Sequence, residues 1–272
     1  MKLSPVTVVE KTPKTNCGEC GYPTCIAFAT ALTRKKVYYT KCPYFKADAK
    51  FIKLIDQLFV SEKNDKKPGD TAVNMLVERL KYKDFSELAK YLGAEIKKEN
   101  NCEILKLNYL KYLATVKKGK DKIFVECDKK DFDVWDKILI LNYLYFCGKT
   151  GLSGEWIAME SMPNSISKVK ALKRDCEEPL KDFFKGKKEV LIQKIKNLPH
   201  KFLEKPECQS DICAVIYVFP MVPIRINFWD ELPQEGFDAN VKFLFDKNAL
   251  NYLDLEALVF ASEKIVEELV RG

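Results

Sequence analysis

Four cysteine residues near the N-terminus have types and spacing that suit metal chemistry. They are Cys17, Cys20, Cys25 and Cys42, in the pattern C-x2-C-x4-C-x16-C-P. Cysteine thiolates are ligands of iron–sulfur clusters and of zinc. Short loops let the first three sulfurs converge on one side of a metal centre, and the fourth arrives with Pro43 from the next stretch of chain. The pattern favours an iron–sulfur cluster held by these four residues, which are thus the candidate metal-ligating and cofactor-binding site.

Zinc is the main alternative occupant of four cysteines. Structural zinc sites usually combine two knuckles of the C-x2-C or C-x2-H type. In this chain Cys17 and Cys20 form one such knuckle, and no second one follows. Gly18 and Gly21 also leave backbone amides free to approach the sulfurs, where hydrogen bonds tune a cluster. We therefore prefer the cluster and keep zinc, or thiols without a metal, as alternatives.

The neighbouring elements must hold these cysteines in a tight loop. Asn16, the two glycines and Pro23 are turn-forming residues. A helix is expected from Thr24 onward, and its N-terminal amides would face an anionic centre. Residues 1–12, with their valine-rich run, favour an extended segment or short strand. A further short helix is expected over residues 46–58.

The charge of the chain is concentrated around the cysteines. The whole sequence of 272 residues carries a net charge of +7, and residues 1–60 hold ten Lys/Arg against four Asp/Glu, a net of +6. Basic segments often bind nucleic acid, but this one has no helix-turn-helix, zinc-finger or aromatic-interleaved RNA signature. We therefore expect no nucleic-acid partner. The lysines can balance the charge of a cluster or dock an acidic redox protein such as a ferredoxin.

Cellular location is inferred from what the sequence lacks. It has no run of 18 apolar residues, so no membrane span is expected. Its first residues do not form the apolar stretch of a signal peptide. We expect a cytoplasmic protein, in which ten cysteines favour metal ligation over disulfides.

The remaining chain predicts an α+β fold, with a small N-terminal cluster domain followed by a larger mixed domain. The polar residues 61–71 are the expected linker between a domain at 1–60 and one at 72–272. Helices are expected over residues 72–92, 134–146, 168–185, 187–198 and 253–270. Strands are expected at residues 102–107, 112–116, 122–126, 213–219 and 222–229, the last two as a pair.

Some other residues have chemistry of their own. Cys208 and Cys213 are either a second metal pair or, as we prefer, buried structural cysteines that pack as small hydrophobes. The single histidine, His200, is expected at the surface, and its isolation excludes Ser-His-Asp chemistry and histidine-rich metal sites. Arg225 lies in an apolar strand, where we prefer a buried ion pair with Asp230 or Glu231 over an anion-binding role.

The run Gly-Leu-Ser-Gly-Glu-Trp at residues 151–156 has a serine near two glycines. It is not the G-x-S-x-G motif, and a turn before a strand is the preferred interpretation. The alternative is that Glu155 and Trp156 line a pocket. Glycine-rich motifs for dinucleotides or for phosphates are missing from the sequence, so nucleotide binding has no support.

The cysteine segment resembles a known family. Lys-Thr-Asn-Cys-Gly-Glu-Cys-Gly-Tyr-Pro-Thr-Cys-x-x-Phe-Ala, followed by Cys-Pro, is similar to the four-iron, four-sulfur domain of the large subunit of the corrinoid iron–sulfur protein of the acetyl-CoA pathway. It also resembles the cluster domain of the B subunit of the Rnf electron-transport complex. The match spans roughly residues 12–50. It implies that Cys17, Cys20, Cys25 and Cys42 each ligate one iron of a [4Fe-4S] cluster, a low-potential one-electron carrier.

The resemblance to the corrinoid protein does not reach its large barrel, but it implies a corrinoid protein as a partner, since there the cluster rescues oxidised cobalt. Residues 72–270 resemble an uncharacterised domain family that follows such cluster domains in anaerobic bacteria and archaea. The similar stretches include residues 138–144, 152–156 and 219–229. Where that family carries a compact acidic run, this chain has residues 229–237, so any role of that run is open here.

Three functions are consistent with the sequence. The preferred one is a low-potential one-electron carrier or redox accessory in anaerobic metabolism, with no catalytic residue assigned. The first alternative is an enzyme, a cluster-dependent reductase or reductive activator of a corrinoid protein, with a ligand pocket in the second domain near Glu155, Trp156 and Arg225. The second alternative is a structural or sensing metal module, which would lose its fold without metal.

Overall fold

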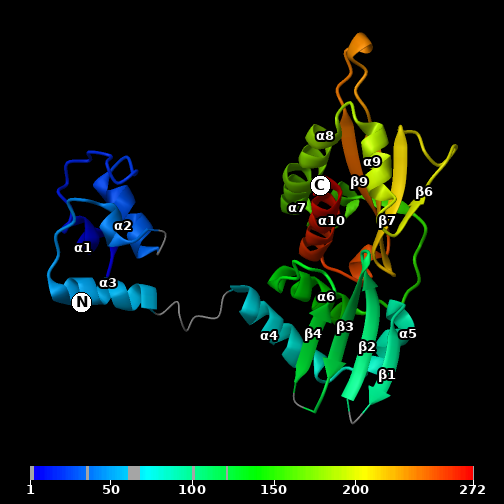
Figure 1. Cartoon of the computed structure of the whole chain (residues 1–272), viewed down its shortest axis with the longest axis horizontal. Helices are drawn as coiled ribbons and strands as arrows, with labels where there is room; N and C mark the ends of the chain where they lie inside the picture. The colour runs from blue at the N-terminus through cyan, green and yellow to red at the C-terminus, as the bar shows by residue number, and fades with distance from the viewer. Residues whose placement is uncertain (1–2, 35–36, 61–67, 100–101, 121, 272) are drawn as a thin grey trace. The chain divides into compact units, whose positions relative to one another are not determined.

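The structure is a computed structural model that describes residues 3–34, 37–60, 68–99, 102–120 and 122–271. The chain divides into two compact units, Met1–Pro68 and Gly69–Gly272. Both contain helices and the larger one contains two antiparallel sheets, which confirms the α+β class (Figure 1). Within the described ranges, no helix is both long and apolar enough to cross a membrane. The predicted linker at 61–71 lies largely outside the described residues, and a helix already begins at Pro68.

The described residues of the smaller unit form three α-helices, which are α1 (Pro5–Val9), α2 (Cys25–Thr33) and α3 (Ala49–Val60). Their buried side chains form a core of their own, made by Val8, Phe28, Ala29, Leu32, Phe51 and Ile55 together with Cys20 and Cys42. The expected helices after Thr24 and within 46–58 are present. The prediction of an extended segment at residues 6–9 is wrong, because the chain is helical there.

A capping box explains the helix at α1. The Ser4 hydroxyl accepts a hydrogen bond from the backbone N–H of Thr7, and the Thr7 hydroxyl accepts one from the backbone N–H of Ser4. Pro5 occupies the first turn, where its missing N–H costs nothing. These end effects outweigh the weak strand preference of valine and threonine.

The larger unit begins with helices α4 (Pro68–Leu80) and α5 (Phe85–Leu92). A single helix over 72–92 was expected, but Asp84 caps a new helix by accepting from the backbone N–H of Ser86 at 2.8 Å. The first sheet follows in the order β1-β2-β3-β4. Its antiparallel strands are β1 (Glu95–Glu99), β2 (Cys102–Tyr109), β3 (Tyr112–Lys118) and β4 (Ile123–Cys127). Helix α6 (Val134–Phe146) comes next, with the bounds that the sequence predicted.

The second sheet has the order β5-β9-β8-β7-β6 and is also antiparallel. Its strands are β5 (Trp156–Ala158), β6 (His200–Phe202), β7 (Ile212–Phe219), β8 (Val222–Trp229) and β9 (Asn240–Asp246). The expected pair β7 and β8 is confirmed, and β5 is the strand expected after the turn at residues 151–156. Strands β1, β6 and β9 were not predicted.

Helices pack along the second sheet (Figure 1). They are α7 (Ile166–Leu172), a π-helical segment (Lys173–Glu177), α8 (Glu178–Phe184), α9 (Lys188–Ile195) and α10 (Leu255–Val270). The helix expected over 168–185 is therefore one helical stretch interrupted by a π segment. Such segments are uncommon and often occur near functional sites.

The two sheets share a single hydrophobic core. The tip of the β2–β3 hairpin reaches the second sheet, where the backbone N–H of Leu110 donates to the carbonyl of Val218 at 2.8 Å. The ring of Phe219 stacks between those of Tyr109 and Tyr143, at centroid distances of 5.3 Å and 4.3 Å. The larger unit therefore behaves as one packed body.

Candidate functional site

The four predicted ligands lie in one part of the smaller unit. Cys17 is exposed and Cys20 is buried in the loop before α2, Cys25 is the first residue of α2, and Cys42 follows a short 3₁₀ turn (Tyr39–Lys41). Burial raises the pKa of the Cys42 thiol, and negative charge on Cys20, Cys25 and Cys17 raises it further. The fold therefore brings Cys42, which is distant in the sequence, near the other three cysteines.

The loop that carries the first two cysteines has an alternating backbone. Lys14, Asn16 and Gly18 have positive φ values of 59°, 53° and 77°, and the residues between them do not. Gly21 adds a fourth positive value, 81°. Alternation of this kind turns successive backbone N–H groups toward one concave side, which is the geometry of anion-binding nests at phosphate and iron–sulfur sites.

The hydrogen bonds at Cys25 show how the loop acts on a thiol. Burial alone would raise the pKa of Cys25, but backbone N–H groups of Asn16, Lys14 and Thr15 and the hydroxyl of Thr12 outweigh burial and lower it. The amide oxygen of Asn16 also accepts from the backbone N–H of Cys25 at 2.8 Å, which fixes the start of α2 against the loop. The surroundings therefore favour a thiolate at this position.

A second hydrogen-bonded contact joins this loop to the segment that carries Cys42. The Tyr44 hydroxyl donates to both carboxylate oxygens of Glu19, at 3.1 Å and 3.0 Å. Glu19 lies between Cys17 and Cys20, and Tyr44 lies two residues beyond Cys42. This contact keeps the distant cysteine beside the loop.

The donor set fits an iron–sulfur cluster. Four thiols and a row of inward N–H groups are the donors that such a cluster needs. Among the residues that the structure describes, no three His, Cys, Asp or Glu side chains gather closely enough to hold one metal ion. A cluster spreads its ligands more widely than one ion does, because each thiolate binds a different iron.

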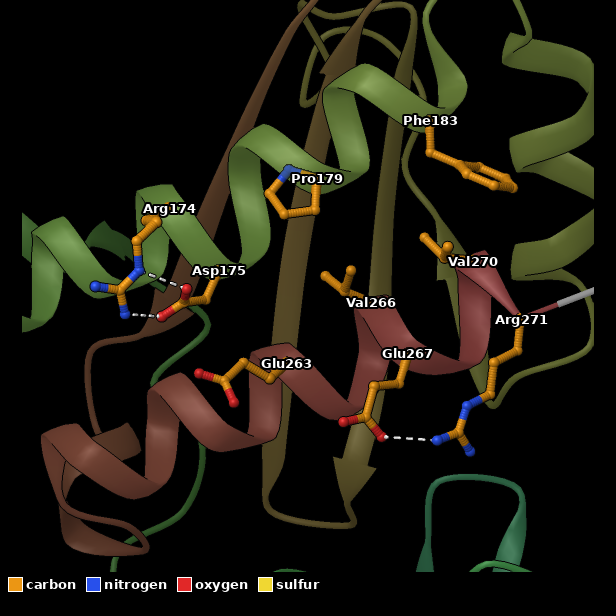
Figure 2. A pocket seen from close by; sticks show the side chains of 9 residues that line it. All are labelled: Arg174, Asp175, Pro179, Phe183, Glu263, Val266, Glu267, Val270 and Arg271. Atoms are coloured by element: carbon orange, nitrogen blue, oxygen red, sulfur yellow. Dashed lines mark hydrogen bonds and ion pairs between the residues drawn. The ribbon is translucent and has the colours of Figure 1, made fainter. Parts of the chain in front are cut away.

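The larger unit contains a groove that no motif predicted. It has a volume of about 720 Å³ and runs between the π-helical segment with α8 and the last helix α10. Pro179, Phe183, Val266 and Val270 form its apolar lining, and Arg174, Asp175, Glu263, Glu267 and Arg271 supply charge. Asp175 pairs with Arg174, and Glu267 pairs with Arg271. Glu263 lies between these two pairs (Figure 2). Burial and the nearby Asp175 raise the pKa of Glu263.

Comparison with known proteins divides the chain as the structure does. Residues 13–44 match the family described as "Putative Fe-S cluster". Residues 84–268 match the family described as "Domain of unknown function (DUF3786)", which is more than half of the chain. The chain belongs to the DUF3786 family. This establishes the predicted resemblance for both parts and shows that an iron–sulfur domain precedes a DUF3786 domain.

Relatives of known function match only the N-terminal part. A stretch of 59 residues is 44% identical to the acetyl-CoA decarbonylase/synthase complex subunit gamma 2 of Methanosarcina mazei, covering 21% of this chain and 13% of that protein. A stretch of 44 residues is 48% identical to the corrinoid/iron-sulfur protein large subunit of Moorella thermoacetica, covering 16% and 10%. The chain thus spans only about a tenth of the length of these relatives. No solved structure matches it.

Several of the other residues selected from the sequence lie in the DUF3786 domain, and some of them differ from expectation. Cys208 and Cys213 form a disulfide with a Cα–Cα distance of 5.6 Å, and they bind no metal as a pair. The expectation of metal ligation over disulfides therefore fails for this pair. The loop before β7 folds back on its strand, since the N–H of Leu203 donates to the carbonyl of Cys213 at 2.9 Å, and this brings the two sulfurs together.

His200, which was expected at the surface, is half-buried. It begins β6, and its ring contacts Phe202 edge to face at 4.9 Å. The expected ion pair of Arg225 with Asp230 or Glu231 is wrong. Asp230 accepts backbone N–H groups of the α8–α9 connection, and Glu231 pairs with a lysine, so neither carboxylate is free to turn toward β8.

The glycine-flanked serine forms the expected turn before β5. The buried carboxylate of Asp246 accepts from the Ser153 hydroxyl at 2.9 Å and from the backbone N–H of Gly154 at 2.9 Å. Glu155 is exposed and pairs with Lys247 at 2.9 Å. Neither Glu155 nor Trp156 lines the groove described above.

Proposed function

We propose that this chain is a cytoplasmic one-electron carrier whose [4Fe-4S] cluster is held by Cys17, Cys20, Cys25 and Cys42. The observation that carries the proposal is the placement of the four cysteines in one small unit, beside a loop with alternating positive φ values whose backbone N–H groups face the Cys25 sulfur. The N-terminal family match and the similarity to subunits with iron–sulfur names support it. When bound, such a cluster accepts and donates one electron at a time.

The residues of the chain have separable tasks in this proposal. The four thiolates bind the irons, and the backbone N–H groups around Asn16 stabilise negative charge on the sulfurs. Cys17 is exposed, so that side of the site is open to a redox partner. Helix α2 directs its N-terminus at the centre, where its dipole also favours negative charge.

The cluster is tested by metal analysis of protein purified without oxygen. We expect about four irons per chain, as for a Cys₄-ligated [4Fe-4S] cluster, and an S = 1/2 electron paramagnetic resonance signal after reduction with dithionite. Cys17→Ala should lose the signal, whereas Cys102→Ala, which alters a half-buried thiol of β2, should keep it. One zinc per chain and no signal would contradict the carrier and favour a structural metal module.

The excess of lysine and arginine in residues 1–60 supports an acidic redox partner such as a ferredoxin. Attraction between a segment of charge +6 and an acidic protein speeds their encounter and weakens with salt. We expect the rate constant for electron exchange with an acidic ferredoxin to fall several-fold from about 0.05 M to about 0.5 M salt. Stopped-flow absorbance of the cluster measures this rate. A salt-independent rate would contradict electrostatic docking, and a corrinoid protein would then be the next partner to test.

The groove beside α10 favours one alternative, a cluster-dependent reductase or reductive activator. Its volume of about 720 Å³ is within the usual range of ligand sites, and Glu263 has the raised pKa that such sites often contain. A thermal-shift screen of small metabolites tests this. A ligand that stabilises the wild type but not Glu263→Gln would favour the enzyme, whereas equal shifts in both would exclude binding at Glu263.

A further inference from the structure

The Cys208–Cys213 disulfide has a cationic neighbour on the sheet. In the register of β7 and β8, Cys213 is opposite Asn227 and Val215 is opposite Arg225. Alternate residues of a strand share a face, so Cys213, Asn227 and Arg225 lie on the same face of the sheet. The neighbouring residues of β7 fill the core, so this face points away from it.

The side-chain hydrogen bonds of Arg225 go to uncharged acceptors, so its positive charge can still attract a negatively charged sulfur. Its Nε donates to the amide oxygen of Asn227 at 2.8 Å, and an Nη donates to the backbone carbonyl of Glu207 at 2.7 Å. Both acceptors are neutral. The same Nη is 3.7 Å from the Sγ of Cys213, and the Ser210 hydroxyl is 2.9 Å from that sulfur. The Ser210 hydroxyl also donates to the backbone carbonyl of Ile212 at 2.8 Å. In the disulfide Arg225 is thus the donor to Cys213, and the hydroxyl lies where its proton can turn to a thiolate there.

The other sulfur belongs to the loop that precedes β7. Cys208 is 7% exposed and is flanked by the exposed residues Glu207 and Gln209, whereas Cys213 lies within the sheet and is 2% exposed. An attacking thiolate thus has its easier approach at Cys208. The disulfide encloses only a short loop, so it stabilises the fold less than a long-range bridge does.

We propose that Cys208 and Cys213 form a reversible dithiol–disulfide site that exchanges electrons with a dithiol, with Arg225 and Ser210 stabilising the thiolate released from Cys213. A thiolate of the dithiol attacks Sγ of Cys208, the Cys208–Cys213 bond breaks, and its electron pair leaves on Cys213. The second thiolate of the dithiol then attacks the mixed disulfide and releases Cys208. Two electrons and two protons pass to the protein, and the dithiol becomes a disulfide. A leaving thiolate stabilised by a guanidinium makes this exchange faster and the disulfide easier to reduce.

The test is a redox titration of the full chain, purified with its metal centre and kept without oxygen. The protein is equilibrated in mixtures of reduced and oxidised dithiothreitol, alkylated, and digested, and mass spectrometry counts the labelled Cys208 and Cys213 peptides. We expect one two-electron transition without denaturant. Arg225→Met should lower the equilibrium constant for reduction about tenfold, which is a shift of about 30 mV to more negative potential.

Matched variants separate charge from packing. Arg225→Lys keeps the positive charge and should titrate near the wild type, as should Arg174→Met, which removes a guanidinium from the distant groove. Ser210→Ala removes only a hydroxyl and should shift the potential in the same direction as Arg225→Met. It replaces Arg225→Met as the test variant if that protein does not fold. The proposal is overturned if the pair is reduced only in denaturant, or if it is found as free thiols in the most oxidising mixture. It is also overturned if folded Arg225→Met and Ser210→Ala titrate with the wild type.

Discussion

Asp136 is a fully buried carboxylate at the centre of a polar network in the DUF3786 domain. The Tyr109 hydroxyl donates to it at 2.6 Å, and the ammonium group of Lys129 lies 2.9 Å away. The backbone N–H of Asp133 and the ammonium group of Lys264 complete its surroundings, at 3.1 Å and 3.5 Å. Burial would raise the pKa of Asp136, but these partners outweigh burial and lower it. The network joins α6 to α10 through charged groups that are buried from solvent.

We predict that Asp136→Asn is strongly destabilising. The substitution keeps the shape of the side chain but removes the anion that faces the buried ammonium group of Lys129. Lys264 also loses this partner and keeps Glu267 at 3.3 Å. Breaking a buried pair in this way costs about 3–5 kcal/mol. Urea unfolding followed by circular dichroism measures the loss. Glu126→Gln, which breaks the exposed pair with Lys117, is the control and should cost less than about 1 kcal/mol. Equal losses in the two variants would contradict a structural role of the network.

The same carboxylate predicts how stability depends on pH. An aspartate whose pKa is lowered by folding contributes stability above its unfolded pKa of about 3.9, and this contribution is lost as the pH falls toward the folded pKa. The difference in unfolding free energy between wild type and Asp136→Asn should therefore be constant near neutral pH and shrink below about pH 4. Urea titrations at several pH values measure it, and a difference that grows in acid would contradict the assignment.

The sequence predicts chemistry for the first unit more specifically than for the second. The spacing of Cys17, Cys20, Cys25 and Cys42 was enough to select them as candidate ligands. Ligands of one metal centre must converge, and short loops between cysteines are a pattern that allows this. The hydroxyl of Thr12 that helps to favour the Cys25 thiolate has no such signature. The buried network and the disulfide were also missed, since their residues meet only after distant strands and helices pack.

At the scale of elements, the predicted bounds were accurate where the residues at the ends of a helix mark its start and stop. Helix α6 was found with its bounds because Asp133 caps it and Gly148 follows it. The helix predicted over 72–92 was wrong in its middle, because the periodicity of apolar residues continues across the cap at Asp84. The short strands β5 and β6 have three residues each, too few to show alternation, and pairing with longer neighbours stabilises them.

The end of α5 gives a prediction about backbone conformation. Gly93 has a φ of 62°, and a Cβ there would lie 2.7 Å from the Cβ of Pro220, which is part of a rigid ring. We expect Gly93→Ala to lower the free energy of unfolding by at least about 1–2 kcal/mol, from left-handed strain and this contact together. Gly151→Ala is the matched control, since its Cβ would meet nothing within 4 Å, and it should be nearly neutral. If both variants unfold at the same urea concentration, the close approach of α5 to Pro220 is wrong.

At the scale of the whole molecule, the two units differ in how much core they possess. The unit Gly69–Gly272 has a large continuous core that includes both sheets. The unit Met1–Pro68 relies on a few side chains of three short helices, and two of its buried groups are the thiols of Cys20 and Cys42. A domain of about 60 residues buries little apolar surface and often needs a metal to stay folded. The proposed cluster would therefore be part of the stability of the first unit alone.

This difference predicts two unfolding transitions, of which one depends on metal. Scanning calorimetry of the full chain with its cluster should show a transition for each unit, and removal of iron by oxidation and a chelator should lower or abolish only that of the first unit. Cys42→Ala should mimic metal removal, whereas Cys147→Ala, which alters a buried thiol at the end of α6, should shift only the other transition. A single transition that moves with iron content would show that the DUF3786 domain also depends on the cluster, and the separate cores would then not unfold separately.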